Sequence, residues 1–511
     1  MAASATESSI ALDEPGPHGG RSLAPVLMIA LATVSLLLIV APRYGYHRDE
    51  LYFLEAGKHL AWGYVDQPPF VPFITWLAEH TIGDSPLAIR LLPALADGAI
   101  IVLTASIARR FGGRRFAQVL AALSAATTGV YLGAAHLLSP TPFDFLSWAL
   151  ILYLVVRILG GDSPRLWLAA GAVAGVGLLN KWSVLFLVFG LAVGFLMSGQ
   201  RQQFHSPWLW GGAAIAVMLW APNLIWQAQQ GWPTIEMLGN LHGENVADGN
   251  QLTFVPAQIL YTGLLLTPIW IAGLRWLFLA PDGRAYRSIA WAYVVLFVLF
   301  LFIAGKPYYI AGLYVTLYPA GSVVTERWLE RRAGRFPSRR AVIVGIVAIT
   351  ILGLPVGLPL LPPGVLRTVP LQAVNYDLGE TIGWPAFTQD VARVYRSLPA
   401  AERRTAVIFT GNYGEAGAID RFGPSLGLPS AFSGHNSDWW WGPPSVPRST
   451  TIFVGDAPRS YLESFWRDCA VAGRLDNGIG VDNEEQGQAI WICRGQLSDW
   501  TAMWPDLKHY G

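Results

Sequence analysis

Apolar segments long enough to cross a bilayer recur between residues 23 and 361 of this 511-residue chain. A helix needs about 20 apolar residues to cross the ~30 Å hydrocarbon core, and backbone groups in lipid must be hydrogen-bonded internally. The pattern predicts a polytopic α-helical membrane protein with about eleven transmembrane helices. The expected spans are Leu23–Val40, Leu87–Ile107, Phe116–Leu132, Phe143–Leu159, Leu166–Leu179, Ser183–Met197, Trp208–Trp226, Val255–Leu277, Ile289–Ile303, Tyr309–Val324 and Ala341–Leu361.

The composition supports the same class. The chain is 53% hydrophobic and only 14% charged, whereas soluble domains carry about 25% charged residues. The formal net charge is +1, and the basic residues are spread among loops, so no nucleic-acid partner is expected.

Arginines set the expected orientation in the membrane. They fall in every second loop, as at Arg109–Arg115 and Arg327–Arg340, and positively charged short loops stay on the cytoplasmic side. The N-terminus is then cytoplasmic in a multi-pass plasma-membrane protein. The first polar loop and the stretch after Leu361 lie outside the cell.

Three parts follow from this pattern. Residues 1–22 are expected to form a disordered cytoplasmic tail, and 23–361 a transmembrane domain whose first external loop, 42–86, carries juxtamembrane helices. Residues 362–511 are expected to form a small extracytoplasmic α/β domain. Its expected strands are 405–410, 451–454 and 489–493, with a turn at 411–415 and a helix at 416–422.

Both cysteines, Cys469 and Cys493, belong to this last part. An oxidising compartment would allow them to pair, but two isolated cysteines leave the question open.

The first external loop concentrates charge beside the bilayer, where charge is costly and usually functional. Asp49 is expected to be the N-cap of a helix from Glu50 to about Trp62, and a second helix is expected at Phe70–His80 after Pro68-Pro69. Asp49 and Asp66 would then stand at helix ends over one cavity. In the alternative interpretation Asp49 is only a cap and Asp66 only a turn residue.

Several motifs in order resemble the GT-C class of integral-membrane glycosyltransferases, in particular the group of protein O-mannosyltransferases and the lipid A aminoarabinose transferase. The resemblance covers approximately residues 25–330. Its motifs are Tyr46-His-Arg-Asp-Glu-Leu-Tyr52, Tyr64-Val-Asp-Gln-Pro-Pro-Phe70, Ile89-Arg90-Leu-Leu-Pro93, Pro140-Thr-Pro-Phe-Asp144, Asn180-Lys181, Lys306-Pro-Tyr-Tyr309 and Leu317-Tyr-Pro319.

The resemblance implies transfer of a sugar from a polyprenyl-phosphate-linked donor to an acceptor hydroxyl on the outer face. The acceptor is a lipid, a glycan or a protein. Asp49 matches the residue that acts as general base in such enzymes, and one carboxylate suffices for single-displacement inversion. The predicted substrate-binding residues are Arg48, Glu50, Asp66, Arg90, Asp144, Lys181, Lys306 and Tyr309.

Each of these roles has an alternative. The basic residues would also serve as interfacial anchors, Asp144 as a helix N-terminal acid, and Tyr308 and Tyr309 as aromatic-belt residues.

A divalent metal ion is a candidate cofactor. Asp66 matches an acidic position that binds a divalent ion in some relatives, and His242, from the external loop 227–251, is a candidate second ligand. The relatives carry Glu followed by Lys where this chain has Asp66 followed by Gln67, which puts the metal and the adjacent cation in doubt.

The aromatic segment Ser433–Pro444 is interpreted either as an acceptor-binding surface or as a packed or membrane-facing loop. A secondary transporter or a lipid-linked sugar flippase is the rival function. Transporters place charges near the bilayer midplane in repeated halves, whereas here the charges cluster at outer span ends and no repeat is found. A surface binding protein anchored by the spans is a third interpretation, for which eleven spans are excessive.

Overall fold

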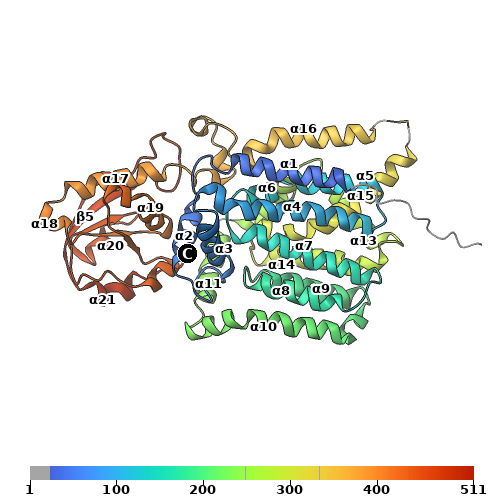
Figure 1. Ribbon diagram of the computed structural model, residues 1–511, viewed down its shortest axis with the longest axis horizontal. Coiled ribbons are helices and arrows are strands. Elements are labelled where there is room, and N and C mark those ends of the chain that lie inside the picture. Colours follow the sequence, from blue (N-terminus) through green and yellow to red (C-terminus); the bar gives the residue numbers. More distant parts are fainter. Residues whose placement is uncertain (1–22, 248, 333, 336) are drawn as a thin grey trace, which may run out of the picture.

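The computed structural model describes residues 23–511 apart from Asp248, Ala333, Phe336 and the side chain of Glu244. The tail predicted at residues 1–22 lies outside the described residues. Figure 1 shows a long helical part and, at one end of it, a domain with a β-sheet. Helices α2 and α3 lie between these two parts. The chain is therefore mostly helical with a small C-terminal sheet domain, as predicted.

The helical part contains α1 to α16. The bounds are α1 Ala24–Val40, α2 Arg48–Lys58, α3 Phe70–Thr81, α4 Pro86–Arg110, α5 Arg115–Ala126, α6 Gly129–Ala135, α7 Pro140–Leu159, α8 Leu166–Leu178, α9 Val184–Met197, α10 Pro207–Gln229, α11 Pro233–Ala247, α12 Asn250–Thr262, α13 Thr267–Leu279, α14 Arg287–Phe302, α15 Tyr314–Arg331 and α16 Arg339–Gly357, with 3-10 turns η1 Arg201–His205, η2 Arg284–Tyr286 and η3 Pro307–Leu313.

The C-terminal part contains five strands. The bounds are η4 Pro363–Arg367, η5 Leu371–Ala373, η6 Tyr376–Leu378, α17 Trp384–Ser397, α18 Ala400–Arg403, β1 Val407–Thr410, α19 Tyr413–Phe422, η7 Pro424–Leu426, β2 Ala431–Ser433, η8 Asn436–Trp441, β3 Thr451–Val454, α20 Arg459–Glu463, β4 Trp466–Arg474, β5 Ala489–Gln496, α21 Trp500–Met503 and η9 Trp504–Leu507.

The number of membrane spans is not confirmed. Within the described residues, five helices are long and apolar enough to cross a bilayer, or seven if each of two bent pairs counts as one span. Helices α1, α8 and α9 are apolar but shorter. The predicted span 309–324 is divided between η3 and α15, and α15 does not meet the same test. The boundary proposed at residues 361/362 stays a prediction.

Two predicted spans are broken rather than straight. Helices α5 and α6 meet at 56°, and α12 and α13 at 105°, so the predicted continuous span 255–277 is wrong. Gly263, with φ +89°, allows the second break. Threonine hydroxyls beside the breaks add hydrogen bonds to backbone carbonyls: Thr128 Oγ1 donates to Ser124 O at 2.7 Å, and Thr267 Oγ1 donates to Gly263 O at 3.1 Å.

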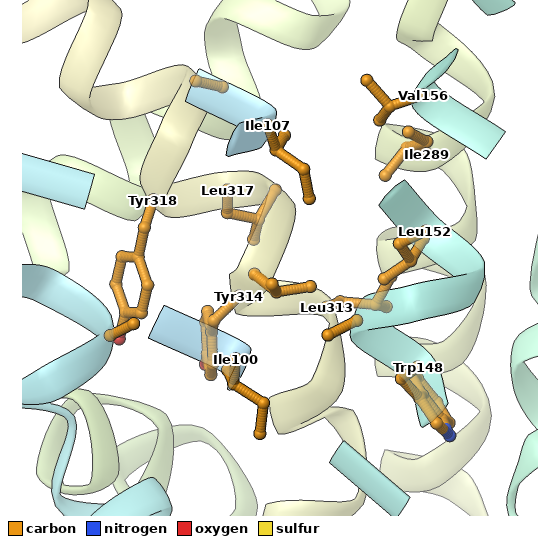
Figure 2. Close-up of a cluster of buried hydrophobic side chains, with 14 of the residues drawn as sticks. Ile100, Ile107, Trp148, Leu152, Val156, Ile289, Leu313, Tyr314, Leu317 and Tyr318 are labelled. Carbon is orange, nitrogen blue, oxygen red and sulfur yellow. The ribbon is translucent and has the colours of Figure 1, made fainter. Parts of the chain in front are cut away.

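The helical core is packed around α4, α7, α14 and α15. Figure 2 shows Ile100 and Ile107 of α4 facing Tyr314 and Leu317 of α15, with α7 and α14 beyond them. Close approach of α13 and α15 depends on glycine, because a Cβ on Gly321 would lie 1.9 Å from the carbonyl oxygen of Ile269. Small residues at helix contacts are the usual means of packing helices in a bilayer.

The juxtamembrane helices share a hydrophobic core with the C-terminal domain. Leu51 and Phe53 of α2 and Val71 of α3 belong to one buried cluster with Trp384 of α17 and Ile408 of β1. This continuous core joins the sheet domain to the first external loop.

The sheet has the order β2-β1-β3-β5-β4. Strands β2, β1 and β3 are parallel, and β5 and β4 run antiparallel to their neighbours. The three predicted strands correspond to β1, β3 and β5, whereas β2 and β4 were not predicted. The predicted turn at 411–415 is partly helical, because α19 begins at Tyr413.

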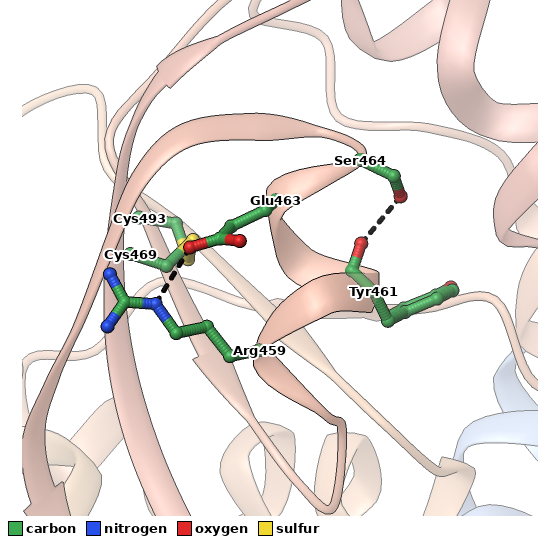
Figure 3. Close-up of a disulfide and its surroundings, with 6 residues drawn as sticks. All are labelled: Arg459, Tyr461, Glu463, Ser464, Cys469 and Cys493. Atoms are coloured by element: carbon green, nitrogen blue, oxygen red, sulfur yellow. Dashed lines mark hydrogen bonds and ion pairs between the residues drawn. A yellow bond between two sulfur atoms is a disulfide. The ribbon is translucent and has the colours of Figure 1, made fainter.

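Cys469 and Cys493 form a disulfide, which settles the question that the sequence left open. They face each other as register partners on β4 and β5, and both are buried (Figure 3). The neighbouring helix α20 carries an ion pair of Arg459 with Glu463 on the outside of this edge.

Replacing both cysteines by alanine is expected to destabilise the C-terminal domain by about 2–4 kcal/mol, because the bond closes a chain segment and restricts the unfolded state. Thermal unfolding of the purified protein would show a lower unfolding temperature for the double variant than for the wild type. Dithiothreitol should lower the unfolding temperature of the wild type and leave that of the double variant unchanged. Equal transitions of wild type and variant would contradict a stabilising role.

Candidate functional site

A cavity of about 700 Å³ lies where α2, the two broken helix pairs and the start of the C-terminal domain meet. Polar side chains line one region: His47, Asp49, Ser139, Thr141, Lys306, Tyr308, Asn375, Tyr376 and Asp377. Most of the other lining side chains are apolar, including Leu132, Leu260, Leu266, Ile346, Ile349 and Leu354, with Thr127, Tyr261, Thr262 and Thr350 among them. The lining therefore combines charged and apolar side chains, which suits an amphipathic molecule.

The helix breaks create the wall of this cavity. Thr127 and Gly129 stand at the break between α5 and α6, and Gly263 and Leu266 at the break between α12 and α13, and all four line it. Irregular backbone at membrane depth is tolerated where it is buried or lines a cavity. The bends are therefore part of the site.

The N-terminus of α2 presents Asp49 to the cavity. His47, not Asp49, is the N-cap: its Nδ1 accepts the backbone N–H of Asp49 at 3.1 Å, and Glu50 Oε2 accepts the N–H of His47 at 2.8 Å. The prediction that Asp49 caps the helix is wrong. The helix also ends at Lys58, four residues before the predicted end at Trp62. The Asp49 side chain is therefore not used in capping and is 35% exposed.

Tyr413 of the C-terminal domain contacts the Asp49 carboxylate. Its hydroxyl donates to Asp49 Oδ1 at 2.9 Å. Helix α19 comes close enough because it presents glycine to α2: a Cβ on Gly414 would lie 2.8 Å from Arg48 Cβ, and one on Gly417 would lie 2.8 Å from the backbone of Leu51. The helix thus holds a hydrogen-bond donor against Asp49 and leaves its second oxygen, Oδ2, facing His47 at 3.9 Å.

His47 links α2 to the segment after the last membrane helix. Its Nδ1 acts as an acceptor, so the proton belongs on Nε2, which lies 3.6 Å from Asp377 Oδ1. Burial would raise the pKa of Asp377, but the Nε2–H of His47 that faces it and the ammonium of Lys306 lower it overall. Asp377 therefore stays ionised beside the cavity.

Arg48 does not point its charge into the cavity. Its guanidinium pairs with Glu484, donates to the Tyr376 hydroxyl at 3.1 Å and lies 3.8 Å from Glu380 Oε2. The predicted role in substrate binding is not supported by this placement, because the guanidinium is engaged by carboxylates of the C-terminal domain. Tyr376, which lines the cavity, accepts a hydrogen bond from Arg48 and donates its hydroxyl to Glu484.

Glu50 and Arg90 form a buried ion pair that does not line the cavity. Arg90 Nε and Nη2 lie 2.8 and 2.6 Å from the two Glu50 oxygens, and Glu50 also accepts the backbone N–H of Leu138 at 2.8 Å. Burial would raise the pKa of Glu50, but Arg90 and the backbone donors lower it. Both residues were predicted to bind substrate, and that role stays a prediction; in the structure their charged groups are engaged by each other and by backbone groups.

Asp66 lies near Asp49 but outside the cavity lining. It accepts the Tyr52 hydroxyl at 2.6 Å, and burial raises its pKa to about 6. His242, the predicted partner for a metal, is an exposed residue of α11. Among the described residues, the one group of three or more such side chains that is spaced to share an ion includes neither residue. Asp66 is hydrogen-bonded by Tyr52 and His242 is exposed, so these two residues do not make up a metal site by themselves.

The remaining predicted residues gather behind the polar region of the cavity. Asp144 of α7 accepts the Ser183 hydroxyl, and the Lys181 ammonium lies 5.2 Å and 5.4 Å from the ring centres of Tyr308 and Tyr309. Tyr309 packs against Phe300, whereas its neighbour Tyr308 lines the cavity. The motifs around 140, 180 and 306 thus converge, with Tyr308 rather than Tyr309 facing the cavity.

Among the described residues, Lys306 is the one lysine or arginine in the cavity lining. It precedes η3, is partly exposed, and enters no ion pair with a described carboxylate. Its charge is therefore available to an anion bound in the cavity.

Sequence reasoning missed several residues of the site. His47 lies inside the quoted motif and was not singled out, although His three residues before Glu50 is a capping-box spacing. Tyr376, Asp377 and Tyr413 come from the C-terminal part, and no motif indicated that this part reaches Asp49. The polar segment Asn375–Asp377 lies beyond the last predicted span, separated from it by residues 362–374.

The aromatic segment predicted at 433–444 is packed. Trp439 Nε1 donates to Trp504 O at 2.8 Å and Trp440 Nε1 to Tyr510 Oη at 3.0 Å. Trp441 stacks on His59 at the end of α2, with 4.6 Å between ring centres. Of the two interpretations, the packed loop is supported.

Comparisons with known proteins agree with this geometry. Residues 66–226 match the family of dolichyl-phosphate-mannose-protein mannosyltransferases. Lipid A galacturonosyltransferase RgtD of Rhizobium johnstonii is 25% identical over 296 residues, which are 55% of this chain and 60% of that protein. The chain thus matches less than two thirds of the length of this relative.

Solved structures share the fold over almost the whole chain. The crystal structure of ArnT from Cupriavidus metallidurans bound to undecaprenyl phosphate has a TM-score of 0.57 at 15% identity, covering 92% of this chain and 98% of ArnT. Its apo structure has a TM-score of 0.55 at 18% identity, covering 91% and 97%. The resemblance predicted from the motifs, to GT-C glycosyltransferases of the protein O-mannosyltransferase and aminoarabinose transferase type, is thereby confirmed.

Proposed function

We propose that this protein transfers a sugar from a polyprenyl-phosphate-linked donor to an acceptor hydroxyl, with Asp49 as the general base. The observation that carries the proposal is the cavity of about 700 Å³ that is lined by the charged side chains of Asp49 and Lys306 and by many apolar side chains. A polyprenyl phosphate combines the same two characters, a charged phosphate and a hydrocarbon chain. The similarity to the undecaprenyl-phosphate-bound ArnT fold supports the same class of donor.

In the proposed step the acceptor oxygen attacks the anomeric carbon of the donor sugar. The new bond forms as the bond from that carbon to the phosphate oxygen breaks, and the configuration inverts. The hydroxyl proton passes to the Asp49 carboxylate. Tyr413 holds one carboxylate oxygen by its hydrogen bond, which leaves the other for the acceptor.

The leaving group is a phosphate monoester that gains negative charge as the bond breaks. Lys306 offers an unpaired ammonium to it, and preorganised charge aimed at a leaving group lowers the barrier. The Tyr308 hydroxyl lines the same region and can donate to a phosphate oxygen. No step is routed through a metal at Asp66, because Asp66 and His242 do not make up a metal site by themselves.

The transfer is proposed to occur on the extracytoplasmic face. The arginine distribution supports this proposal, because it predicts the first external loop and the C-terminal domain on that side. The disulfide within the C-terminal domain supports this orientation, because disulfides persist in oxidising compartments. The acceptor class, a lipid, glycan or protein hydroxyl, stays open to the assay.

Replacing Lys306 by Met is expected to lower kcat/KM for the donor by roughly 10- to 100-fold, since a hydrogen bond to a charged group contributes about 1.5–3 kcal/mol. Lys306→Arg should retain most of the activity. Inhibition by free polyprenyl phosphate should weaken in Lys306→Met, and Lys58→Met, at the exposed end of α2, is the matched control. Unchanged product inhibition in Lys306→Met would remove Lys306 from the phosphate site.

A transporter of lipid-linked sugars is a second candidate function. The observation that favours it is the pair of broken helices in the cavity wall, a feature that transporters use at substrate sites. Transporters, however, tend to place their charges near the bilayer midplane within repeated halves, whereas the charges of this sequence cluster at the outer ends of the predicted spans and no repeat is found. Turnover of a donor by purified protein distinguishes the two functions.

A further inference from the structure

Three glutamates of the C-terminal domain meet at its contact with α2. Glu380 precedes α17, whereas Glu484 and Glu485 lie in the connection between β4 and β5. One carboxylate oxygen of each lies within 4.8 Å of the oxygens of the other two. The fold thus brings two distant segments together through side chains of like charge.

The carboxylate of Glu485 lacks partners in this cluster. The residue is 5% exposed, and neither of its carboxylate oxygens has a hydrogen-bond partner among the described groups. Glu380 is fully buried; its Oε1 accepts the backbone N–H of Glu484, and its Oε2 has no hydrogen bond. Buried carboxylates are normally hydrogen-bonded, paired or bound to a metal ion, so these oxygens indicate a missing ligand.

The charges nearby do not balance. Arg48 pairs with Glu484, and its guanidinium lies 3.8 Å from Glu380 Oε2. Among the described residues, Arg48 is the basic residue that forms ion pairs with these three glutamates. Glu415 of α19 adds a fourth carboxylate close enough to repel Glu485. One guanidinium therefore faces an excess of negative charge that a bound cation would neutralise.

We propose that Glu380, Glu484 and Glu485 bind one divalent cation that prefers oxygen ligands, of the Ca²⁺ or Mn²⁺ type. The cluster contains carboxylates and no His or Cys, which favours hard ions over Zn²⁺. Ca²⁺ lies about 2.3–2.6 Å from its oxygens, so opposite ligands stand about 4.8 Å apart. All three carboxylates can therefore reach one ion.

The bound ion would fasten the C-terminal domain to the helix that carries Asp49. Glu484 holds Arg48, the neighbour of Asp49, and accepts the hydroxyl of Tyr376, which lines the cavity. The proposed ion site therefore contacts a residue of the cavity lining, Tyr376, but does not itself line the cavity. It takes no part in the transfer step, so the two proposals can fail separately.

The test is equilibrium dialysis of the full-length chelator-treated protein in detergent against radioactive Ca²⁺, with Mn²⁺ measured by electron paramagnetic resonance. The wild type should bind one ion per chain. Glu485→Gln should weaken binding by about tenfold or more, whereas Glu485→Asp should retain part of it. Glu463→Gln, an exposed glutamate of α20 paired with Arg459, is the matched control and should bind normally.

Two results would overturn the proposal: no Ca²⁺ or Mn²⁺ bound by the wild type at millimolar concentration, or equal affinity in Glu485→Gln. Gel filtration verifies that each variant is folded. If Glu485→Gln does not fold, Glu484→Gln replaces it, because that side chain is 41% exposed and tolerates the change better. Undiminished binding by Glu484→Gln would then overturn the assignment in the same way.

Discussion

Asp49→Asn is expected to reduce kcat for sugar transfer by roughly 10²- to 10⁴-fold, the usual contribution of a positioned general base. An amide cannot accept the acceptor's proton, but its carbonyl oxygen still accepts the hydrogen bond that Tyr413 donates to Asp49 at 2.9 Å. The geometry of α2 is therefore kept. The measurement is steady-state transfer of radiolabelled sugar at matched expression levels.

The control for this variant is Glu55→Gln, which removes a carboxylate from the same helix. Glu55 pairs with Lys58 and does not line the cavity. Donor binding should be unaffected in both variants, so KM stays close to that of the wild type while kcat falls in Asp49→Asn alone. Equal kcat in Asp49→Asn and wild type would show that another group takes the proton.

Arg90→Met is expected to destabilise the protein by about 3–5 kcal/mol, because it leaves a buried charge without its partner. The Glu50 and Arg90 side chains are 0% and 1% exposed, and Glu50 bridges α2, α4 and the backbone at Leu138. We expect a large loss of monodisperse protein and a lower unfolding temperature, measured by gel filtration after heating. This is a stability effect, not a loss of donor affinity.

The double variant Glu50→Gln with Arg90→Met distinguishes a stability effect from a loss of donor affinity. Removing both charges should recover part of the stability that Arg90→Met loses, since no unpaired charge is left. Arg448→Met, which breaks the exposed pair with Asp499, should change the unfolding temperature little. If Arg90→Met is stable but binds the donor poorly, the substrate-binding role predicted from the motif is correct after all.

The sequence predicted the class of fold well because apolar length and arginine distribution are local features. The helices at Phe70–Thr81 and Val184–Met197 and the strands β1 and β3 lie close to their expected places. The break at Gly263 was missed because the residues on both sides are equally apolar, and hydropathy does not register a change of direction. The edge strand β4 was missed because buried and exposed residues do not alternate regularly along it.

The candidate site was predicted only in part. Asp49 and Lys306 line the cavity, whereas Arg48, Glu50 and Arg90 are engaged by other protein groups. A motif shows that a charged residue is present near the site, but not whether another side chain already neutralises it. Arg90 lies 40 residues from Glu50, and Glu484 lies 436 residues from Arg48, so only the three-dimensional contacts reveal these partners.

The central claim is that the cavity holds a polyprenyl-phosphate sugar that Asp49 turns over. The most direct test is to incubate the purified wild-type protein with a panel of labelled polyprenyl-phosphate sugars and membrane extracts as acceptor. The account predicts that one donor is consumed, that polyprenyl phosphate is released and that the label appears on an acceptor with inverted configuration. No turnover of any donor, with movement of the intact lipid-linked sugar across vesicles instead, would contradict it and identify a transporter.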